Sequence, residues 1–149
     1  DFLLGLRLSP ERFDVHLPDI IEVAKVILAA GKIDFLDMSL WDSFKEPEDE
    51  AFKGCSLLSY FTELERGDVA LGIAGKLRNP DEVNRAMAAG IDFIMLGRAA
   101  ILHHDFPLQM QADQDFTPVR NPVSADYLRA EGLGEAFITY MSGWKGFVG

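Results

Sequence analysis

The sequence has little of what marks secreted or membrane proteins. It contains a single cysteine, Cys55, so no disulfide can form within the chain, and a reducing, cytoplasmic location is the expectation. Long apolar runs are also absent: the apolar start over residues 2–6 meets Arg7 too soon for a secretory signal, and no stretch is long enough to span a bilayer. We therefore expect a cytoplasmic protein with no membrane partner.

Positive charge is scarce as well. Fourteen Lys and Arg residues stand against 24 Asp and Glu residues, which gives a net charge of −10. Nucleic acids and anionic membranes both need a clustered basic surface, so the balance argues against either as the main partner. A local basic pocket for one small anion is still compatible with it. What is present is apolar: 48% of the 149 residues are hydrophobic, which suits one compact domain.

Short apolar runs alternate with segments of helical periodicity. The runs lie at 2–8, 33–39, 68–74 and 93–96, and the helical segments at 18–30, 57–66, 80–89 and from about 98. This β-α-β-α order predicts an α/β fold with a parallel sheet and right-handed crossovers. The strands are nearly continuous apolar runs, which is typical of strands covered on both faces.

The ends of two helices are marked by residues with known preferences. Pro18 suits the first turn of the first helix, and Gly31 is placed to end it. Asn79 suits an N-cap before Pro80, and Gly90 is placed to end that later helix.

The tail over 105–149 differs in character from the rest. It has three prolines, two helical stretches at 123–131 and 135–142, and a final aromatic cluster made of Phe137, Tyr140, Trp144 and Phe147. Because buried aromatic rings are usually core, we expect this tail to pack on the outside of the sheet and not to form a ligand-stacking site.

Distinctive residues lie at the carboxyl ends of the four predicted strands. In order they are Arg7, Ser39, Ala74-Gly75 and Gly97-Arg98. Ligands of parallel α/β folds bind at the carboxyl ends of the strands. Glycine lets a ligand approach the backbone, helix N-termini attract anions, and an arginine neutralises them. The last two turns therefore predict a phosphate site, which in an eight-stranded barrel follows strands 7 and 8.

Each of these features also has a structural interpretation. A Gly-Arg pair after a strand is often only a turn with a surface arginine. Arg7 needs a partner in an apolar strand, and Asp37 is a candidate; Ser39 can bond to local backbone. His103-His104-Asp105 invites a metal interpretation, but adjacent histidines do not share a helical face and no spaced third ligand is evident. No metal site is predicted.

Three stretches resemble the FMN-binding end of the old yellow enzyme family, the NADH:flavin oxidoreductases. They are "LGLRLSPERF", "IDFLDMSLWD" and, most specifically, "AGKLRNPDEVNRAMAAGIDFIMLGRAAI". The resemblance covers residues 1–107 and implies the C-terminal half of a (β/α)8 TIM barrel, strands 5–8. The family's usual ending is not recognisable in 120–149, and residues 108–149 are expected to form a helical C-terminal extension that packs on the barrel. The resemblance implies FMN as cofactor, NADH or NADPH as electron donor, and a small-molecule substrate such as an activated alkene.

The resemblance also assigns cofactor contacts. Arg7 matches the arginine that contacts the pyrimidine side of the flavin, and Ala74 and Gly75 match the turn whose amides meet the FMN phosphate. The family often has two glycines there, so Ala74 departs from the pattern. Gly97 and Arg98 match the phosphate-binding pair of the last strand. The family's substrate-anchoring pair and proton-donating tyrosine come from the first half of the barrel, so no catalytic residue is assigned.

A half barrel leaves two sheet edges open. We therefore expect the chain to need the N-terminal half of the barrel or self-association, and to be inactive alone. Two alternatives remain at this stage. One is a phosphate-binding barrel that acts as an isomerase or lyase, and the other is a non-catalytic half-barrel.

Overall fold

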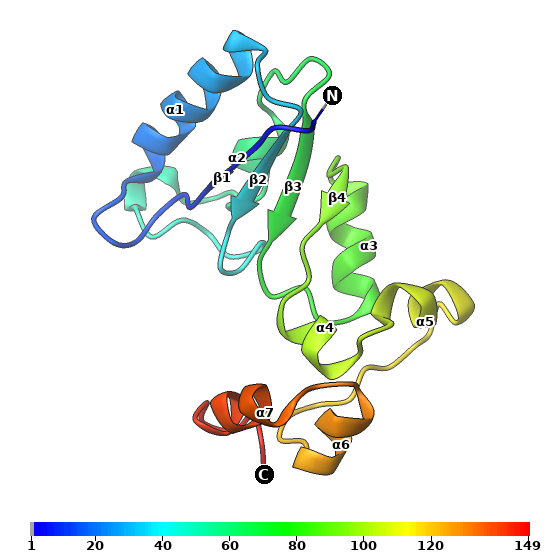
Figure 1. The fold of residues 1–149 in the computed structure, drawn as a ribbon. Coiled ribbons are helices and arrows are strands. Elements are labelled where there is room, and N and C mark those ends of the chain that lie inside the picture. Colours follow the sequence, from blue (N-terminus) through cyan, green and yellow to red (C-terminus); the bar gives the residue numbers. More distant parts are fainter. Residues whose placement is uncertain (1) are drawn as a thin grey trace. The chain divides into compact units, whose positions relative to one another are not determined.

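The computed structural model describes residues 2–149 (Figure 1). The chain forms two compact units, each described here by itself. The first comprises Asp1–Leu77 and Asp81–Met95, and the second comprises Arg78–Pro80 and Leu96–Gly149.

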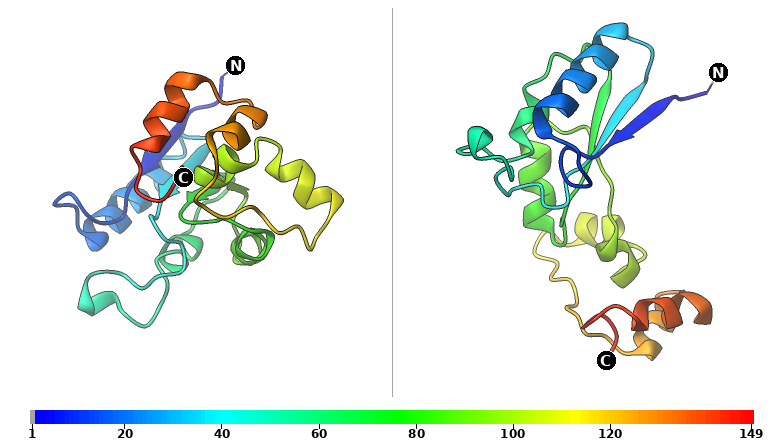
Figure 2. Two further views of the ribbon diagram at one scale, coloured as in Figure 1. Left: turned by 90° about the horizontal axis from the view of Figure 1, so that it is seen from below. Right: turned by 90° about the vertical axis from the view of Figure 1, so that its left-hand side faces the viewer.

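The first unit is a parallel α/β structure. Its elements are β1 (Gly5–Leu8), α1 (Leu17–Ala30), β2 (Phe35–Ser39), η1 (Glu50–Phe52), α2 (Ser59–Thr62), β3 (Ala70–Ala74), α3 (Pro80–Ala88) and β4 (Phe93–Ile94). The sheet has the order β1-β2-β3-β4, and every neighbouring pair is parallel. The predicted α/β class and parallel sheet are thus confirmed. The right-hand view of Figure 2 shows β1, β2 and β3 fanning out beside one another.

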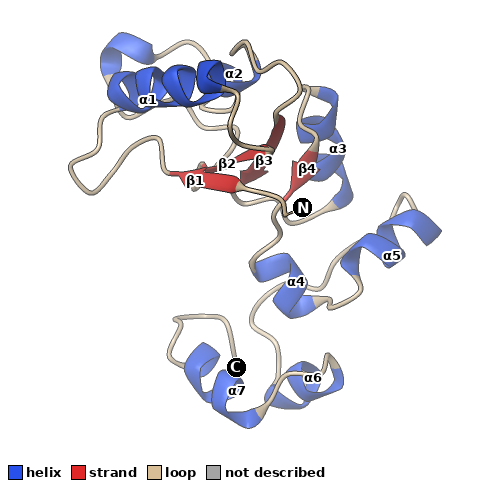
Figure 3. Cartoon of the chain, turned by 45° about the horizontal axis from the view of Figure 1, so that its top comes forward, coloured by secondary structure: helices blue, strands red, loops and turns tan. Residues whose placement is uncertain are grey.

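The strand order shows no reversal, so right-handed crossovers place the helices on one face of the sheet (Figure 3). That face is apolar, and its central residues Leu36, Met38, Leu71 and Ile73 are almost completely buried. The pairing register puts a different set on the opposite face, which we call the open face: Gly5, Arg7, Phe35, Asp37, Ser39, Gly72, Ala74 and Phe93. The apolar runs had suggested strands covered on both faces, but within this unit the helices cover only one.

The helix ends follow the predicted signals. Pro18 lies in the first turn of α1, and Gly31 ends that helix with a left-handed backbone (φ 58°), its N–H donating to the Leu28 carbonyl at 3.0 Å. Gly90 follows α3 with φ 96°. These two glycines provide the backbone conformation that side chains disfavour.

Two elements are shorter than the sequence pattern suggested. The helix expected over 57–66 is a single turn, α2. Leu57 and Leu58 are buried, but they belong to the turn that precedes this helix. The last strand, β4, has two residues, although the Met95 N–H still donates to the Ile73 carbonyl at 2.8 Å. Apolar periodicity in both places reflects burial and not regular backbone.

The same arrangement recurs at the amino ends of two strand pairs. Asp34 Oδ2 accepts from the Leu4 N–H at 2.7 Å, and Asp92 Oδ2 accepts from the Leu71 N–H at 2.7 Å. Each aspartate also donates its own N–H to the same leucine's carbonyl. Arg66 reinforces the second copy, because its guanidinium pairs with Asp92 and donates to the Gly90 carbonyl at 2.9 Å.

The phenylalanine after each of these aspartates lies over a glycine of the preceding strand. Gly5 pairs with Phe35 and Gly72 with Phe93, and a Cβ on either glycine would lie about 2 Å from ring carbons, at 2.0 Å and 2.1 Å. The two rings meet edge to face with centroids 5.6 Å apart. The sequence signals are a repeated Leu-Gly and a repeated Ile-Asp-Phe.

The second unit is helical. It contains α4 (Arg98–Leu102), α5 (Phe106–Ala112), α6 (Ala125–Ala130) and α7 (Glu135–Ser142). Its core consists of Leu102, Val123, Leu128, Ile138, Met141 and Phe147. The helical stretches expected at 123–131 and 135–142 are confirmed as α6 and α7. Helix α5 was not anticipated, although Pro107 fits the first turn of a helix.

The aromatic residues of the tail divide between core and surface. Phe147 is buried in the core of the second unit, while Phe137, Tyr140 and Trp144 lie exposed along α7 and its end, in contact with one another. The predicted boundary at 107 and the packing of the tail on a barrel stay predictions. Among residues 2–149, no helix has the length and apolarity to cross a membrane.

Candidate functional site

Arg7 lies on the open face between two side chains of the neighbouring strand. Its Nε is 3.5 Å from Asp37 Oδ2, and its Nη2 donates to Ser39 Oγ at 3.2 Å. The register explains both contacts, because Arg7 pairs directly with Asp37 and Ser39 is two residues further along the same face. The predicted ion pair with Asp37 is present, and Ser39 bonds to Arg7.

The two partners of this pair differ in exposure. The Arg7 side chain is 52% exposed, whereas that of Asp37 is 6% exposed. Burial raises the pKa of Asp37 above its usual value, although the positive charge of Arg7 acts to lower it. Asp37 Oδ1 is buried and has no hydrogen-bond partner among the described residues. The carboxylate is therefore fixed beneath Arg7 and the guanidinium faces outward.

The Ala74-Gly75 turn lies beside this pair, because Ala74 aligns with Ser39 in the register of β2 and β3. The Gly75 carbonyl accepts from Ser43 N at 3.1 Å and from Ser43 Oγ at 3.0 Å. A Cβ on Gly75 would lie 2.6 Å from Ser43 Oγ and 2.9 Å from Ser43 N. The loop after β2 therefore leaves room only for a glycine at position 75. The sequence analysis did not identify this packing requirement.

Gly97 and Arg98 belong to the second unit, two and three residues after Met95, the last residue of the first. The Gly97 carbonyl accepts from Ala100 N at 3.0 Å, which begins α4. A Cβ on Gly97 would meet nothing within 4 Å, so packing within the protein does not require this glycine. Arg98 is exposed. The structure thus gathers Arg7, Ala74 and Gly75, and a phosphate site shared with Gly97 and Arg98 stays a prediction.

The loops after β1 and β2 contain features that the sequence reasoning missed. Arg12, Phe13 and Asp14 have left-handed backbones (φ 79°, 54° and 62°), and so does Trp41 (φ 59°). The Phe13 and Trp41 rings are exposed with centroids 6.1 Å apart, and Arg12 lies 4.5 Å over the Trp41 ring. Strained backbone of this kind concentrates at functional sites. The signal in the sequence was an isolated tryptophan in a polar segment.

An ion-pair network holds these two loops together. Buried Glu11 pairs with Lys45 and accepts from Glu48 N at 2.8 Å, while Arg12 pairs with Glu48 at 3.1 Å. Burial acts to lower the pKa of Lys45, but the hydrogen bonds with Glu11 and Glu48 outweigh it and leave that pKa raised. The ion pairs thus hold in place the two loops that carry the exposed Phe13 and Trp41 rings at the carboxyl edge of the sheet.

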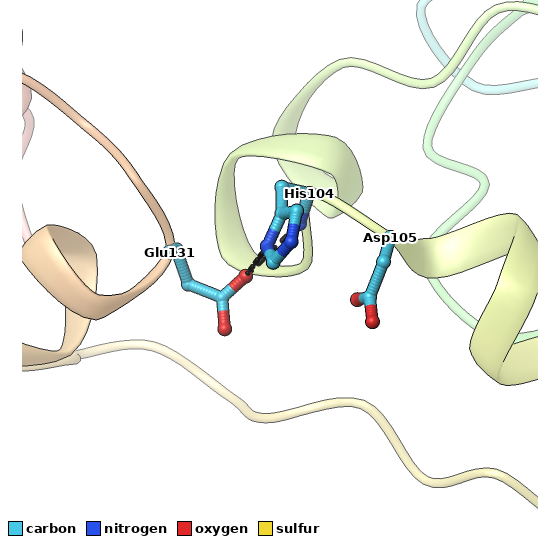
Figure 4. Close-up of side chains that lie close together, drawn as sticks. All are labelled: His104, Asp105 and Glu131. Atoms are coloured by element: carbon cyan, nitrogen blue, oxygen red, sulfur yellow. Dashed lines mark hydrogen bonds and ion pairs between the residues drawn. The ribbon is translucent and has the colours of Figure 1, made fainter.

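A separate cluster lies in the second unit, where His104 Nδ1 is 2.8 Å from Glu131 Oε2 (Figure 4). Asp105 lies nearby, and one potential ligand atom from each of His104, Asp105 and Glu131 lies within 4.8 Å of the other two. Glu131 is the third group that sequence spacing did not reveal. Glu131 also accepts from His104 N at 3.0 Å, and Asp105 accepts from Gln109 at 2.6 Å. His104 and Glu131 thus form an ion pair, and Asp105 bonds to Gln109 of α5.

No family model matches the chain, and no curated protein matches it. The function proposed below therefore rests on the residues and their geometry.

Proposed function

We propose that the chain is the C-terminal part of an FMN-dependent NAD(P)H oxidoreductase of the old yellow enzyme type, with its four strands as strands 5–8 of a (β/α)8 barrel. The observation that supports this most is a sheet of four consecutive parallel strands whose open face carries an outward-facing Arg7 beside the Ala74-Gly75 turn. In a barrel this face becomes the interior, and the carboxyl edge carries the ligand.

The residues present fit such a cofactor. FMN, when bound, would supply the hydride chemistry between NADH or NADPH and a small acceptor such as an activated alkene. Arg7 would lie against the pyrimidine side and stabilise negative charge there. The amides of Ala74 and Gly75, with Gly97 and Arg98, would hold the phosphate, the arginine by charge-assisted hydrogen bonds. Phe13 and Trp41 offer flat apolar surface for an organic substrate.

The open face and the open edges define what else the proposal requires. Four strands do not close a barrel, and the groups expected to anchor and protonate the substrate are not in this chain. We propose that the N-terminal half of the barrel, or a second copy of the chain, completes the enzyme. The chain alone is expected to lack turnover.

The proposal is tested by titrating the chain with FMN while flavin absorbance and fluorescence are followed. We expect a shifted flavin spectrum and saturable binding. Riboflavin, which lacks the phosphate, is the matched control and should bind at least about tenfold more weakly, because it loses the charge-assisted contacts. An unchanged FMN spectrum across the titration would contradict the proposal.

One observation favours the alternative of an isomerase or lyase acting on a phosphorylated metabolite. The ion pair with Asp37 gives Arg7 a structural role that needs no flavin. In that case the chain should bind inorganic phosphate and ignore FMN. Phosphate binding that FMN displaces would instead favour the flavin enzyme.

A further inference from the structure

We infer that Asp37 and Ser39 are positioning residues that fix the Arg7 guanidinium and set the charge it presents to the flavin. This inference rests on the proposed function, because Arg7 acts on a flavin only if one binds. It goes beyond the resemblance, which assigns no role to either residue.

The geometry of the guanidinium carries the first step. Asp37 approaches Nε at 3.5 Å and Ser39 accepts from Nη2 at 3.2 Å, so both partners lie along one edge of the planar group. Arginine has five N–H donors in a rigid fork, and fixing one edge fixes the direction of the other. The remaining donors, on Nη1 and the outer side of Nη2, are left for a ligand over the open face.

The placement of charge carries the second step. Asp37 is almost completely buried, whereas Arg7 is half exposed, so the carboxylate lies on the protein side of the guanidinium. Water screens a buried charge less than an exposed one. The negative charge of Asp37 therefore also acts on a ligand that lies over Arg7. Arg7 is the cation whose charge acts on Asp37, and Asp37 Oδ1 has no hydrogen-bond partner among the described residues. The Asp37 charge therefore acts on Arg7 from the protein side.

The sign of the effect follows. Reduction makes the flavin more negative, and a positive neighbour favours the reduced form. Asp37 offsets part of the Arg7 charge, so Asp37→Asn should raise the reduction potential of bound FMN. Arg7→Gln should lower it. Opposite shifts from the two halves of one ion pair are a result that simple loss of folding does not produce.

The experiment measures the reduction potential of FMN bound to wild type, Asp37→Asn, Arg7→Gln and Asp34→Asn. Asp34→Asn is the matched control, because it removes the same charge from a residue just before β2 at the amino edge, where it contacts Leu4 and not Arg7. The inference expects Asp34→Asn to match wild type. Equal potentials in wild type and Asp37→Asn, or a shift of the same size in Asp34→Asn, would overturn it.

A second readout needs no flavin. The Nε–H signal of Arg7 is followed by NMR in the unliganded chain, where Asp37→Asn and Ser39→Ala should each speed its exchange with water about tenfold or more, as expected for losing one charge-assisted contact. Asp37→Glu should restore part of the protection. Exchange unchanged in both variants would overturn the positioning role. If wild type binds no FMN, the proposed function and the flavin part of the inference fall together, and these signals alone decide whether Arg7 is positioned.

Discussion

At the scale of single residues, the two glycines of the predicted phosphate site are there for different reasons. Gly75 has Ser43 where a side chain would be, and Gly97 has open space. The sequence showed two similar turns after two strands. The structure separates them, because packing requires the glycine at Gly75 and does not require the one at Gly97. We therefore expect substitution of Gly75 and of Gly97 to affect stability differently.

Gly75→Ala should destabilise the first unit by about 1–3 kcal/mol, because the new Cβ would overlap Ser43 Oγ and N and the loop would have to move. Gly97→Ala is the control and should change stability by less than about 0.5 kcal/mol. Urea unfolding of both variants measures this. A loss of stability in Gly97→Ala as large as that in Gly75→Ala would contradict the assignment.

Arg98→Ala should weaken FMN binding by about 2 kcal/mol, the size expected for one lost charge-assisted contact. Arg98 is exposed, so its removal should leave unfolding unchanged. Calorimetric titration with FMN gives the affinity. The same FMN affinity in variant and wild type would remove Arg98 from the proposed site.

At the scale of elements, the paired Gly5–Phe35 and Gly72–Phe93 contacts show how neighbouring strands fit. A ring from one strand covers the space left by the missing side chain on the other. Because glycine weakens a strand interior, its presence in two strands needs such a reason.

Gly72→Ala should destabilise the first unit, because the Cβ would lie 2.1 Å from the Phe93 ring and displace it. Replacing Phe93 by Ala removes the obstacle, so the double variant should be less destabilised than the sum of the single ones, with a coupling of about 0.5–3 kcal/mol. Chemical denaturation of the four proteins measures the cycle. Additive effects would mean that the ring is not what excludes the side chain.

The His104–Glu131 pair, which joins the end of α4 to the end of α6, should make stability depend on pH. The hydrogen bond with Glu131 raises the pKa of His104 above 6.5, so the pair's contribution is complete below pH 6.5 and lost as pH rises through the raised value. Burial acts to raise the pKa of Glu131, but the hydrogen bonds from His104 leave it below 4.5, so the contribution is lost again as pH falls through that value.

His104→Ala should therefore lower the melting temperature more at about pH 5.5 than at about pH 8.5. Glu131→Gln breaks the same pair and should show the same dependence on pH. Thermal unfolding of both variants across this range checks the expectation. A difference from wild type that stays constant with pH would show that the pair is not what the substitution removes.

How far the sequence predicted the fold depended on the kind of interaction. The four parallel strands and α1, with Pro18 in its first turn and Gly31 at its end, were predictable, because apolar patterns and local preferences indicate them. Helix α2 and strand β4 were overestimated, because burial of Leu57 and Leu58 produces the same pattern as a helix. Of the site, Arg7 and its partner Asp37 were predictable, since a cation in an apolar strand needs an acid. The contact of Ser43 with Gly75 and the pair of Phe13 with Trp41 join distant segments and could not be predicted from local sequence.

At the scale of the whole molecule, the first unit has a sheet face and a sheet edge that its own described elements do not cover. One sheet face lacks helices within the unit, and β1 pairs with β2 alone among the described strands. Just before β1, Phe2 and Leu3 are 82% and 77% exposed. An apolar strand edge of this kind invites pairing with another chain or segment.

The purified chain should therefore associate in a concentration-dependent way, and Leu3→Lys should reduce that association, because a charge on the edge opposes pairing. Val26→Lys, which places the same charge at an exposed position of α1, is the control and should have no effect. Sedimentation and light scattering measure the mass. A chain that stays monomeric, or an equal effect of both substitutions, would contradict this prediction.

The aspartates just before β2 and β4 bear on which parts of such a chain can change in evolution. Asp34 and Asp92 align each strand with its neighbour from the amino end, before the chain reaches the residues of the proposed site. Strand alignment and the proposed ligand contacts thus lie at opposite ends of the strands. Segments beyond the carboxyl ends can vary in length and chemistry without shifting the strands, which leaves specificity free to diverge while the scaffold is retained.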